Sequence, residues 1–342
     1  MDTAQEHFME RALSLARLGL GNVSPNPLVG CVIVHKGKII GEGYHKKYGE
    51  AHAEVNAVAS VQNKALLQES TAYVSLEPCA HHGKTPPCAD MLIDNKIKKV
   101  VIAIVDPFSK VNGLGVKKLK DAGVEVEMSA LENKALELNK RFFTFHEKKR
   151  PYIILKWAQT HDGFIAREDF DSKWISNPYS RQLVHQWRAE EDAILIGKNT
   201  AIYDTPSLTV RDWKGKNPTR VLLDANLDVP NLSPLFNDEV DTLIFNKKKE
   251  GHENKNEWIQ VDTLSPAVIL EILHKKNIQS LIVEGGTQVL NSFITENCWD
   301  EARIFTSPQS FGKGVNAPPI LGEIVKSETI FEDELKTIKN NG

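Results

Sequence analysis

The sequence has no long apolar run, and we do not expect its N-terminal region to be a secretory leader. No stretch of its 342 residues approaches the roughly 18 uninterrupted apolar positions that a membrane span requires. The N-terminal region carries Glu6, Glu10, Arg11 and Arg17 among its apolar residues, which is unlike a signal peptide. We therefore expect a cytoplasmic protein with no membrane partner.

Cysteine and basic charge are also scarce. The chain has only four cysteines, too few over its length for a disulfide framework. Its formal net charge of −3 lacks the basic excess of a general nucleic-acid binder, so we expect no nucleic-acid partner. A phosphorylated small molecule stays possible, because it needs only a few local cations. There is no internal repeat and no low-complexity segment.

Helical and strand-like segments alternate in the first half of the chain. A capping-box pattern from Thr3 to Glu6 opens a helical pattern that ends near Gly19 and Gly21. The elements expected next are strands at 29–35 and 39–44, a helix from about 52, a strand at 71–76, a helix at 88–95, a strand at 99–105, a helix at 116–122, a strand at 124–128 and a long helix at 131–145. This order predicts a three-layer α/β/α domain.

A domain boundary is expected in the segment from Glu147 to Pro151, which is charged and then punctuated by proline. We predict two domains, 1–147 and 148–342. Beyond the boundary, strand-like runs alternate with helical stretches and indicate a second α/β domain. The lysine-containing run 246–256 is expected to be an exposed loop. The charged tail 326–342 is expected to fray.

The sharpest signal is a histidine and two cysteines near a carboxylate, in the order His52-Ala53-Glu54, Cys79 and Cys88. One imidazole and two thiolates suit Zn²⁺ and leave a fourth tetrahedral position for water. Zinc lowers the pKa of that water toward neutrality, which yields a hydroxide for attack on an amidine-like ring carbon. Glu54 is the candidate for moving a proton from this water to the departing amine. The arrangement is that of zinc deaminases.

Two features depart from the simplest form of that motif. Residues two apart on a regular helix point in nearly opposite directions. His52 and Glu54 therefore share a cavity only if the helix starts irregularly or Glu54 lies in its first turn. The cysteines are separated by the eight residues 80–87, which predicts a loop with its own task. In that loop Lys84 and Thr85 could hold a phosphate, and His81 or His82 could contact a ring.

Each part of the motif also has a plainer interpretation. A His-x-Glu pattern is common, and two cysteines at this spacing usually serve packing. A structural zinc site is possible as well, but such sites normally have four protein ligands. Cys31 and Cys298 have no neighbouring ligand residues in the sequence, so we interpret them as buried thiols. The ordered combination of all the parts favours the catalytic metal site.

Further segments accompany this motif, namely Ser24-Pro25-Asn26-Pro27-Leu28-Val29-Gly30, Gly43-Tyr44-His45, Gly49-Glu50-Ala51, Glu77-Pro78 and Gly83-Lys84-Thr85-Pro86-Pro87. With them, the first half resembles the deaminase half of the bifunctional riboflavin-biosynthesis deaminase-reductases, a family with a cytidine-deaminase-like fold. The resemblance implies that His52, Cys79 and Cys88 bind zinc and that Glu54 shuttles the proton.

The same resemblance implies a substrate and its contacts. The substrate would be 2,5-diamino-6-(5-phosphoribosylamino)pyrimidin-4(3H)-one, whose 2-amino group leaves as ammonia. Asn26 and His45 would contact the pyrimidine and Lys84 the phosphate, although Asn26 also fits a simple turn.

The second half contains no G-x-G-x-x-G after a strand, so a Rossmann site is not indicated. Its most distinctive segment is Val283-Glu284-Gly285-Gly286-Thr287, which lies between an expected strand and an expected helix. Glycines at such a junction allow the backbone to approach a phosphate at the helix N-terminus. The same pair of glycines also fits an ordinary turn.

A series of short segments follows in order: Lys156-Trp157-Ala158, Asp162-Gly163, Ser172-Lys173-Trp174-Ile175, Gly197 with Thr200, Asp204 to Arg211, Arg220 with Asp224, and Glu284-Gly285-Gly286. Together they resemble the reductase half of the same family, whose fold is similar to dihydrofolate reductase. The resemblance implies a homo-oligomer, a dimer or a tetramer. It also implies NADPH as cofactor, contacted by Ala158, Trp174, Thr200, Asp204, Gly286, Thr287, Gln288, Val289, Leu290, Asn291 and Ser292.

The phosphorylated substrate of this half would contact Ser172, Arg188, Leu208, Arg211 and Glu284, with Lys156 close by. A hydride from NADPH would reduce C1 of the ring-opened ribosyl group of 5-amino-6-(5-phosphoribosylamino)uracil to a ribityl chain. Arg188 and Arg211 suit a phosphate because a guanidinium donates two parallel charged hydrogen bonds, although either also fits as an ordinary surface arginine. Asp204 and Glu284 could bind hydroxyls or assist proton delivery.

Some positions depart from the family pattern and put the affinity for the cofactor in question. They are Thr160-His161, Lys198-Asn199, Thr205 and the turn from Phe311 to Gly314. Three alternatives to a fully active bifunctional enzyme therefore stay open. The chain could be an active deaminase with a degenerate reductase half, a deaminase of nucleic-acid bases, or a zinc-stabilised module without catalysis.

Overall fold

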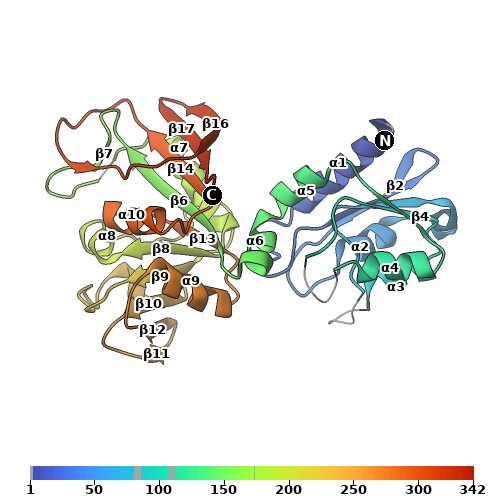
Figure 1. The fold of residues 1–342 in the computed structure, drawn as a ribbon, viewed down its shortest axis with the longest axis horizontal. Coiled ribbons are helices and arrows are strands. Elements are labelled where there is room, and N and C mark those ends of the chain that lie inside the picture. Colours follow the sequence, from blue (N-terminus) through green and yellow to red (C-terminus); the bar gives the residue numbers. More distant parts are fainter. Residues whose placement is uncertain (1–2, 81–85, 108–111, 173) are drawn as a thin grey trace. The chain divides into compact units, whose positions relative to one another are not determined.

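The computed structural model describes residues 3–80, 86–107, 112–172 and 174–342. The chain divides into two units, Met1–Lys148 and Lys149–Gly342 (Figure 1). Each unit is built on a sheet with helices packed against it, so the predicted α/β class is confirmed. Among the described residues, no helix combines the length and apolar character that crossing a membrane demands.

The first unit contains a five-stranded sheet of order β2-β1-β3-β4-β5. Its strands are β1 (Gly30–His35), β2 (Lys38–Tyr44), β3 (Thr71–Val74), β4 (Lys99–Ile102) and β5 (Glu125–Met128). The last three pair in parallel, whereas β1 runs antiparallel to both of its neighbours. The helices are α1 (Thr3–Arg17), α2 (Ala53–Ser60), α3 (Cys88–Asp94), α4 (Leu114–Asp121), α5 (Glu132–Leu138) and α6 (Lys140–Lys148), with a short 3-10 helix η1 (Lys64–Glu69).

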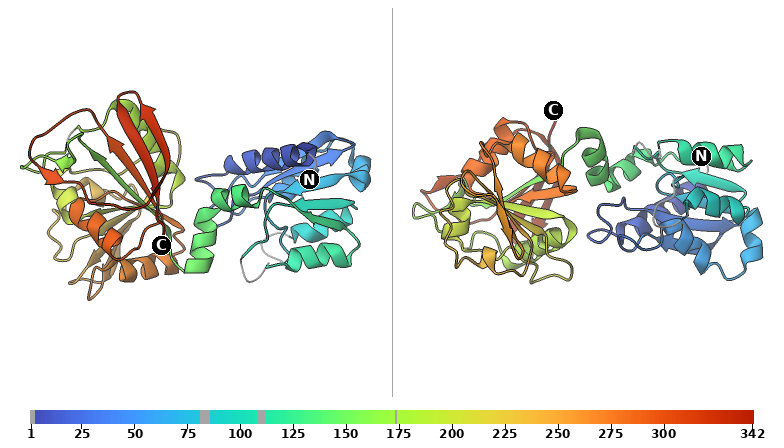
Figure 2. Two further views of the ribbon diagram at one scale, coloured as in Figure 1. Left: turned by 45° about the horizontal axis from the view of Figure 1, so that its top comes forward. Right: turned by 90° about the horizontal axis from the view of Figure 1, so that it is seen from below.

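This sheet is apolar on both faces, and its alternating residues feed two separate cores. Cys31 and Ile33 of β1 join one core with residues of α2, α3 and α4, whereas Val32 and Val34 join the other with residues of α1 and α5. Figures 1 and 2 show these helices on the two sides of the sheet. The result is the three-layer arrangement that the sequence predicts.

The prediction of one long helix at 131–145 is wrong, because the helix is interrupted at Asn139 and forms α5 and α6 instead. The Asn139 side chain is buried, accepts a hydrogen bond from the Leu28 N–H at 2.8 Å and donates one to the Leu28 carbonyl at 2.9 Å. These two hydrogen bonds resemble those between neighbouring β-strands, and they connect the segment before β1 to α5 and α6. The interruption of the helix thus accompanies hydrogen bonds between Asn139 and Leu28, which lies 111 residues away in the sequence.

The second unit contains a ten-stranded sheet of order β11-β12-β10-β9-β8-β13-β6-β14-β17-β16. Its strands are β6 (Tyr152–Gln159), β8 (Ala193–Gly197), β9 (Thr219–Leu223), β10 (Thr242–Asn246), β11 (Gly251–Glu253), β12 (Asn256–Gln260), β13 (Ser280–Val283), β14 (Glu301–Thr306), β16 (Glu323–Ile330) and β17 (Asp333–Lys339). A separate two-stranded pair joins β7 (Phe164–Ala166) to β15 (Val315–Asn316). The helices are α7 (Pro178–Glu190), α8 (Lys198–Tyr203), α9 (Pro266–Lys275) and α10 (Thr287–Thr295), with a 3-10 turn η2 (Pro234–Phe236).

The centre of this sheet is parallel, from β12 through β14, and its two faces carry two cores. Residues of α9 and α10 pack into one core, and residues of α7 and α8 pack into the other. Strand β13 lies between β8 and β6, although it comes much later in the chain. In open α/β sheets, ligands bind at the carboxyl ends of the strands where the strand order reverses. The fold therefore directs attention to the ends of β6, β8 and β13.

Two sequence expectations for this unit are wrong. The tail 326–342 does not fray over 326–339, because β16 and β17 form a hairpin that continues the sheet beyond β14. Asp333 is buried within it and accepts hydrogen bonds from the Asn177 N–H and the Ser180 hydroxyl. The run 246–256 is also not simply a loop, since β11 pairs with β12 there.

Candidate active sites

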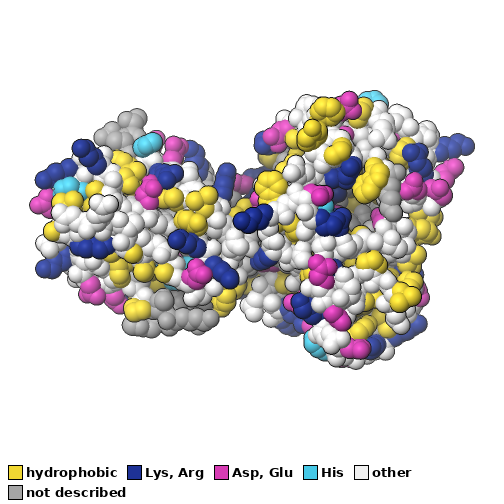
Figure 3. Space-filling model, turned by 180° about the vertical axis from the view of Figure 1, so that it is seen from behind, with side chains coloured by type: hydrophobic (Ala, Val, Ile, Leu, Met, Phe, Trp, Pro, Cys, Tyr) yellow, Lys and Arg dark blue, Asp and Glu magenta, His cyan; other side chains and the backbone are white. Residues whose placement is uncertain are grey.

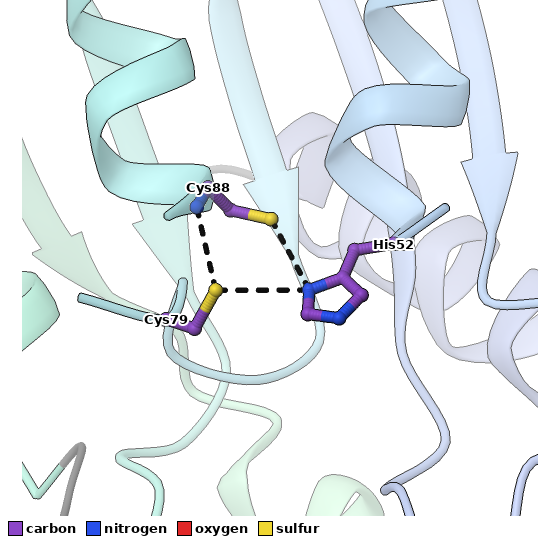
Figure 4. A group of neighbouring side chains, drawn as sticks. All are labelled: His52, Cys79 and Cys88. Carbon is purple, nitrogen blue, oxygen red and sulfur yellow. Dashed lines mark hydrogen bonds between the residues drawn. The ribbon is translucent and has the colours of Figure 1, made fainter. Parts of the chain in front are cut away.

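The structure brings His52, Cys79 and Cys88 together, although the three come from separate parts of the first unit. His52 is the N-cap of α2, Cys79 follows β3, and Cys88 is the first residue of α3. Figure 4 shows the imidazole and both thiols converging, with Nδ1 of His52 turned toward the two sulfur atoms. Their potential ligand atoms all lie within 4.8 Å of one another.

The distances within this cluster fit a tetrahedral metal site. Nδ1 of His52 lies 3.6 Å from Sγ of Cys79 and 3.4 Å from Sγ of Cys88. Ligand bonds of the usual length for Zn²⁺ to nitrogen and sulfur, opened to a tetrahedral angle, place the two ligand atoms about 3.6 Å apart. The cluster therefore has the donor atoms and the spacing for a zinc ion bound by three protein ligands. A fourth position would be left for a small ligand.

The start of α2 explains how His52 and Glu54 can lie on the same side although they are only two residues apart. His52 precedes the helix in an extended conformation, with φ −71° and ψ 166°, and Glu54 lies in the first turn. Gly43 allows α2 to approach β2, because a Cβ at this position would lie 2.3 Å from the backbone nitrogen of Ala57. The irregular start thus brings an imidazole and a carboxylate two residues apart to the same cysteine sulfurs.

The electrostatics of this site favour a proton carrier beside a thiolate. Burial raises the pKa of Glu54 to about 7, and the neighbouring Cys79 adds to the effect. A hydrogen bond with the Cys88 thiol lowers the pKa of Cys79 to about 4, and the same pairing raises the pKa of Cys88. A bound divalent ion would favour both sulfurs as thiolates, since metal ligands must be deprotonated.

Asn26 and His45 lie beside the cluster and contact each other. Nδ2 of Asn26 is 3.1 Å from Nε2 of His45, and Nδ1 of His45 is 3.1 Å from the Ala51 carbonyl. Burial lowers the pKa of His45, so the neutral ring donates from Nδ1 and accepts at Nε2. The rings of His45 and His52 are 5.4 Å apart. The two predicted substrate contacts therefore lie next to the predicted metal ligands.

Glu77 belongs to the motif around Cys79, but the sequence suggested no role for it. Its buried carboxylate ties the Cys79 segment to the start of α4 by accepting hydrogen bonds from backbone N–H groups at 2.8 to 3.2 Å. The donors are Asp106, Gly113, Gly115 and Val116. A Cβ on Gly115 would lie 2.0 Å from the Pro78 carbonyl oxygen, so the two segments pack backbone to backbone.

The loop between the cysteines lies mostly outside the described residues. Lys84, together with Thr85, His81 and His82, belongs to this part. The expectation that Lys84 contacts a phosphate therefore stays a prediction.

The second unit contains a cavity of about 1500 Å³ at the carboxyl ends of β6, β8 and β13. Single small-molecule sites usually measure about 300–1,000 Å³, so this cavity has room for a large cofactor and a second ligand. It is lined by nearly all the residues that the sequence analysis assigned to this half, namely Lys156, Ala158, Ser172, Trp174, Arg188, Thr200, Asp204, Leu208, Arg211, Glu284, Gly286, Thr287, Gln288, Val289, Asn291 and Ser292.

Leu290 is the exception and needs a correction. Its side chain is fully buried in the core beneath α10 and does not line the cavity. Neighbouring positions on a helix point to different sides, so a continuous stretch from Gly286 to Ser292 cannot face one ligand. The prediction that all of 286–292 contacts the cofactor therefore included a core residue.

Glu284 lies at the centre of a buried charge cluster in this cavity. Its carboxylate accepts hydrogen bonds from Nη2 and Nε of Arg188 at 2.8 and 3.3 Å, and it lies 3.8 Å from Nζ of Lys156. Burial alone would raise the pKa of Glu284, but Arg188 and Lys156 outweigh it and hold the pKa at about 2. Burial lowers the pKa of Lys156, and Glu284 offsets only part of this effect.

The Gly285-Gly286 pair allows α10 to approach the sheet and opens its N-terminus to the cavity. Cβ atoms on Gly285 and Gly197 would lie 2.9 and 2.7 Å from side-chain atoms of Val289. Gly286 is the N-cap of α10, and its N–H donates to the Thr200 hydroxyl at 3.2 Å. This arrangement supplies backbone N–H groups at a helix N-terminus, which suits an anion.

The neighbouring segment 204–212 carries further polar groups into the cavity. The Ser172 hydroxyl donates to Oδ1 of Asp204 at 2.9 Å, and Arg211 contacts the Ser207 hydroxyl.

Trp174 is 65% exposed, and the guanidinium of Arg181 lies over its ring at 4.5 Å. An exposed aromatic ring at a cavity mouth can stack against a planar ligand.

His185 also lines this cavity, and the sequence analysis missed it. It lies one turn before Arg188 on α7, so the helical spacing from a predicted phosphate contact was the available signal.

Two of the segments that depart from the family pattern are connected to each other through Asp162. The Thr160 hydroxyl donates to Oδ1 of Asp162 at 2.6 Å. The Asp162 carboxylate accepts from the N–H groups of Phe311 and Gly312, with Oδ2 at 3.0 and 2.7 Å respectively. Thr160 and the segment 311–312 thus belong to one hydrogen-bonded turn, whereas Lys198, Asn199 and Thr205 line the cavity.

Fold and site together define a class: a zinc-binding deaminase domain joined to a reductase domain. Residues 2–104 match the family model "Cytidine and deoxycytidylate deaminase zinc-binding region", and residues 151–339 match the "RibD C-terminal domain". The second unit has the dihydrofolate-reductase-like fold that the resemblance implied.

Relatives match over nearly the whole chain. The riboflavin biosynthesis protein RibD of Aquifex aeolicus is 43% identical, covering 91% of this chain and 89% of the relative. The Escherichia coli RibD is 33% identical, covering 98% and 96%. The crystal structure of a diaminohydroxyphosphoribosylaminopyrimidine deaminase/5-amino-6-(5-phosphoribosylamino)uracil reductase from Thermotoga maritima superposes with a TM-score of 0.92 at 38% identity, covering 98% of both chains. The chain belongs to the RibD family of riboflavin biosynthesis proteins, and it is a bifunctional deaminase and reductase.

Proposed function

We propose that the first unit, over residues 1–147, deaminates 2,5-diamino-6-(5-phosphoribosylamino)pyrimidin-4(3H)-one. The second unit, over residues 148–342, then reduces 5-amino-6-(5-phosphoribosylamino)uracil with NADPH. The Thermotoga maritima relative carries the names of both activities, which supports this assignment. Acidic and basic side chains are interspersed over the visible face of each unit in Figure 3. This mixed surface supports a small-molecule substrate rather than a nucleic acid.

The observation that carries the deaminase assignment is the 3.4 and 3.6 Å spacing of Nδ1 of His52 from the two sulfurs. It suits Zn²⁺ held by His52, Cys79 and Cys88. When bound there, zinc activates a water molecule by lowering its pKa toward neutrality. Glu54, whose pKa burial raises to about 7, would accept a proton from the attacking water and return it to the departing 2-amino group. Asn26 and His45 bind the pyrimidine edge, and Lys84 contacts the phosphate.

The reductase assignment rests on the charge cluster and on the helix N-terminus in one cavity. NADPH supplies the hydride. The side chains of Ala158, Trp174, Thr200 and Asp204, with the cavity-facing residues of 286–292, hold the cofactor, while the α10 N-terminus receives one of its phosphates. Lys156, Ser172, Leu208 and Glu284 contact the ribosyl chain.

Arg188 and Arg211 bind the substrate phosphate in this proposal. Arg188 uses Nε and one Nη group to hold Glu284, so its other Nη group can donate to a phosphate oxygen. Arg211 lines the same cavity from the segment 204–212. Two guanidinium groups around one phosphate would give the substrate its orientation.

We also propose that the chain forms a homo-oligomer through its second unit, in the cytoplasm. Strand β16 forms one edge of the ten-stranded sheet, and an exposed edge is a template for pairing. Large exposed apolar side chains accompany it, namely Tyr179, Leu321, Ile324, Val325 and Phe331. The free thiols at the metal site support a reducing compartment. Light scattering of the purified protein tests the oligomer, and a monomer at micromolar concentration contradicts it.

One preparation tests both activities. We expect about one zinc per chain in the purified protein, ammonia release from the diaminopyrimidine and NADPH oxidation with the uracil. Removing zinc with a chelator should abolish ammonia release and leave NADPH oxidation unchanged, because only the first unit uses the metal. Ammonia release without bound metal would contradict the deaminase proposal, and an absence of NADPH oxidation would contradict the reductase proposal.

A further inference from the structure

His185 is a buried histidine inside the reductase cavity, and it has a specific hydrogen-bond arrangement. Its side chain is 5% exposed and projects from α7, the helix that also carries Arg188. Nδ1 accepts a hydrogen bond from the backbone N–H of Arg211 at 3.2 Å. Nε2 lies 3.5 Å from Oδ2 of Asp212. His185 thus connects α7 to two consecutive residues of the segment 204–212.

The acceptor at Nδ1 determines the tautomer. A ring nitrogen that accepts a hydrogen bond carries no proton, so the neutral ring carries its proton on Nε2, facing Asp212. Burial lowers the pKa of His185, and the cations Arg188 and Arg211 add to this effect against the opposing carboxylates of Asp212 and Glu284. The surroundings therefore favour the neutral form that the contact with Arg211 requires.

The segment that His185 contacts is one whose conformation depends on its neighbours. Thr205 and Leu208 have left-handed backbone conformations, with φ of 42° and 55°, which cost free energy unless the surrounding structure enforces them. Val210 is held by a hydrogen bond from its N–H to Oδ1 of Asn217 at 2.8 Å, and the next residue, Arg211, is exposed. An anchor on the Arg211 backbone restricts where its long side chain can reach.

We propose that His185 is a positioning residue for phosphate recognition. It fixes the backbone of Arg211 against α7, so that the guanidinium groups of Arg211 and Arg188 meet the same phosphate. This inference rests on the proposed role of the two arginines. It assigns no contact between His185 and the substrate.

Two amide substitutions distinguish the two contacts of the ring. His185→Asn places an amide oxygen near the Nδ1 position and keeps an acceptor for the Arg211 N–H. His185→Gln places its amide near the Nε2 position and keeps only the contact with Asp212. The readouts are kcat and KM for NADPH-dependent reduction of 5-amino-6-(5-phosphoribosylamino)uracil and of its dephosphorylated nucleoside, together with thermal unfolding.

We expect His185→Gln to raise KM for the phosphorylated substrate by about tenfold, with kcat within about twofold of the unmodified protein. KM for the dephosphorylated compound should not change, and His185→Asn should restore most of the affinity. Equal behaviour of the Asn and Gln variants, or an equal loss with both substrates, overturns the inference.

Arg211→Met separates this inference from the proposed function. If Arg211→Met leaves KM for the phosphorylated substrate unchanged, the phosphate assignment itself is wrong. If Arg211→Met raises KM but His185→Gln does not, only the positioning role is wrong. Should the substituted proteins not fold, nitrogen NMR of the unmodified protein tests the same point. A proton on Nδ1 of His185 at neutral pH would overturn the inference.

Discussion

Glu54 in the first unit and Glu284 in the second are both buried carboxylates, and their pKa values shift in opposite directions. Glu54 has a pKa of about 7, whereas Glu284 has a pKa of about 2. Glu54 lies next to His52 and two cysteine sulfurs, of which Cys79 adds to the raised pKa of Glu54. Glu284 lies against the cations of Arg188 and Lys156.

Burial raises the pKa of both carboxyl groups, so the difference shows that neighbouring charge decides whether this effect is offset. At Glu54, burial outweighs the neighbouring His52 and yields a group that can exchange a proton near pH 7. With two cations nearby, Glu284 stays an anion, which suits a fixed electrostatic or hydrogen-bonding role. The two units thus use one residue type for two kinds of chemistry.

The largest expected effect is that of Glu54→Gln, which removes the proton carrier. Deamination should fall by about 10³-fold, because an amide cannot accept a proton from water. The neutral amide suits the buried position, so zinc content and NADPH oxidation should be retained. Ammonia release, metal analysis and the reductase assay on one sample check this. Deamination at a near-normal rate would remove Glu54 from the mechanism and end the contrast with Glu284.

Arg188→Met tests the other side of the comparison. Both side chains of the Arg188–Glu284 pair are 12% exposed, so removing the cation leaves a buried carboxylate with only Lys156 at 3.8 Å. We expect the second unit to lose about 3 kcal/mol of unfolding free energy, measured in denaturant.

The control for Arg188→Met is Lys276→Met, which breaks a more exposed pair with Glu257. That change should cost less than about 1 kcal/mol, because water screens the pair. Equal losses in the two variants would mean that the Glu284 cluster contributes no more than a surface ion pair.

The pH dependence should separate the two activities. Glu54 must be ionised to accept a proton, so deamination should fall on the acid side by about tenfold per pH unit below the pKa of Glu54. A bound cation lowers that pKa, so the decline begins at or below about pH 7.

Glu284, in contrast, should cause no decline in activity near neutral pH. The contribution of ionised Glu284 to the free energy of unfolding is fully present above its ordinary pKa of 4.5. It is lost as the pH falls toward about 2. Between pH 5 and 8 the reductase should therefore show no decline from Glu284. Rate profiles of both assays, measured on the same protein, check this. Parallel acid limbs in the two profiles would contradict the comparison.

Glu77→Gln sharpens the comparison with a third buried carboxylate, one held by backbone N–H groups. An amide nitrogen in place of one oxygen faces N–H donors and cannot accept from them, so the Cys79 segment should loosen. We expect zinc affinity to fall by about tenfold, measured by competition with a chelator. Glu69→Gln, an exposed change in the same unit, serves as the control. Unchanged zinc affinity in Glu77→Gln would show that the metal site does not depend on this contact.

Much of the first site could be predicted from the sequence, because its chemistry is carried by residue types in a fixed order. A histidine, a glutamate and two cysteines were sufficient to suggest the metal and the reaction. No role was predicted for Glu77, because its partners, from Asp106 to Val116, are backbone N–H groups that any sequence could supply.

The second site was harder to predict from the residues alone. Its members are common residue types spread from Lys156 to Ser292, and without the family resemblance they form no local motif. Leu290 was assigned to the cavity because the orientation of α10 on the sheet is a tertiary property. His185 was missed because its partner is a backbone N–H 26 residues away.

The order of the two activities along the chain came from the family resemblance. The amino-acid sequence by itself determined the α/β class and the set of candidate metal ligands. These follow from local periodicity and from residue chemistry, which a short window of sequence contains. Only the tertiary structure decided where α5 ends, that the C-terminal residues become β16 and β17, and in which direction the pKa of each buried glutamate shifts. Such outcomes depend on groups that are distant in the chain and close in space, and no local pattern encodes which groups those are.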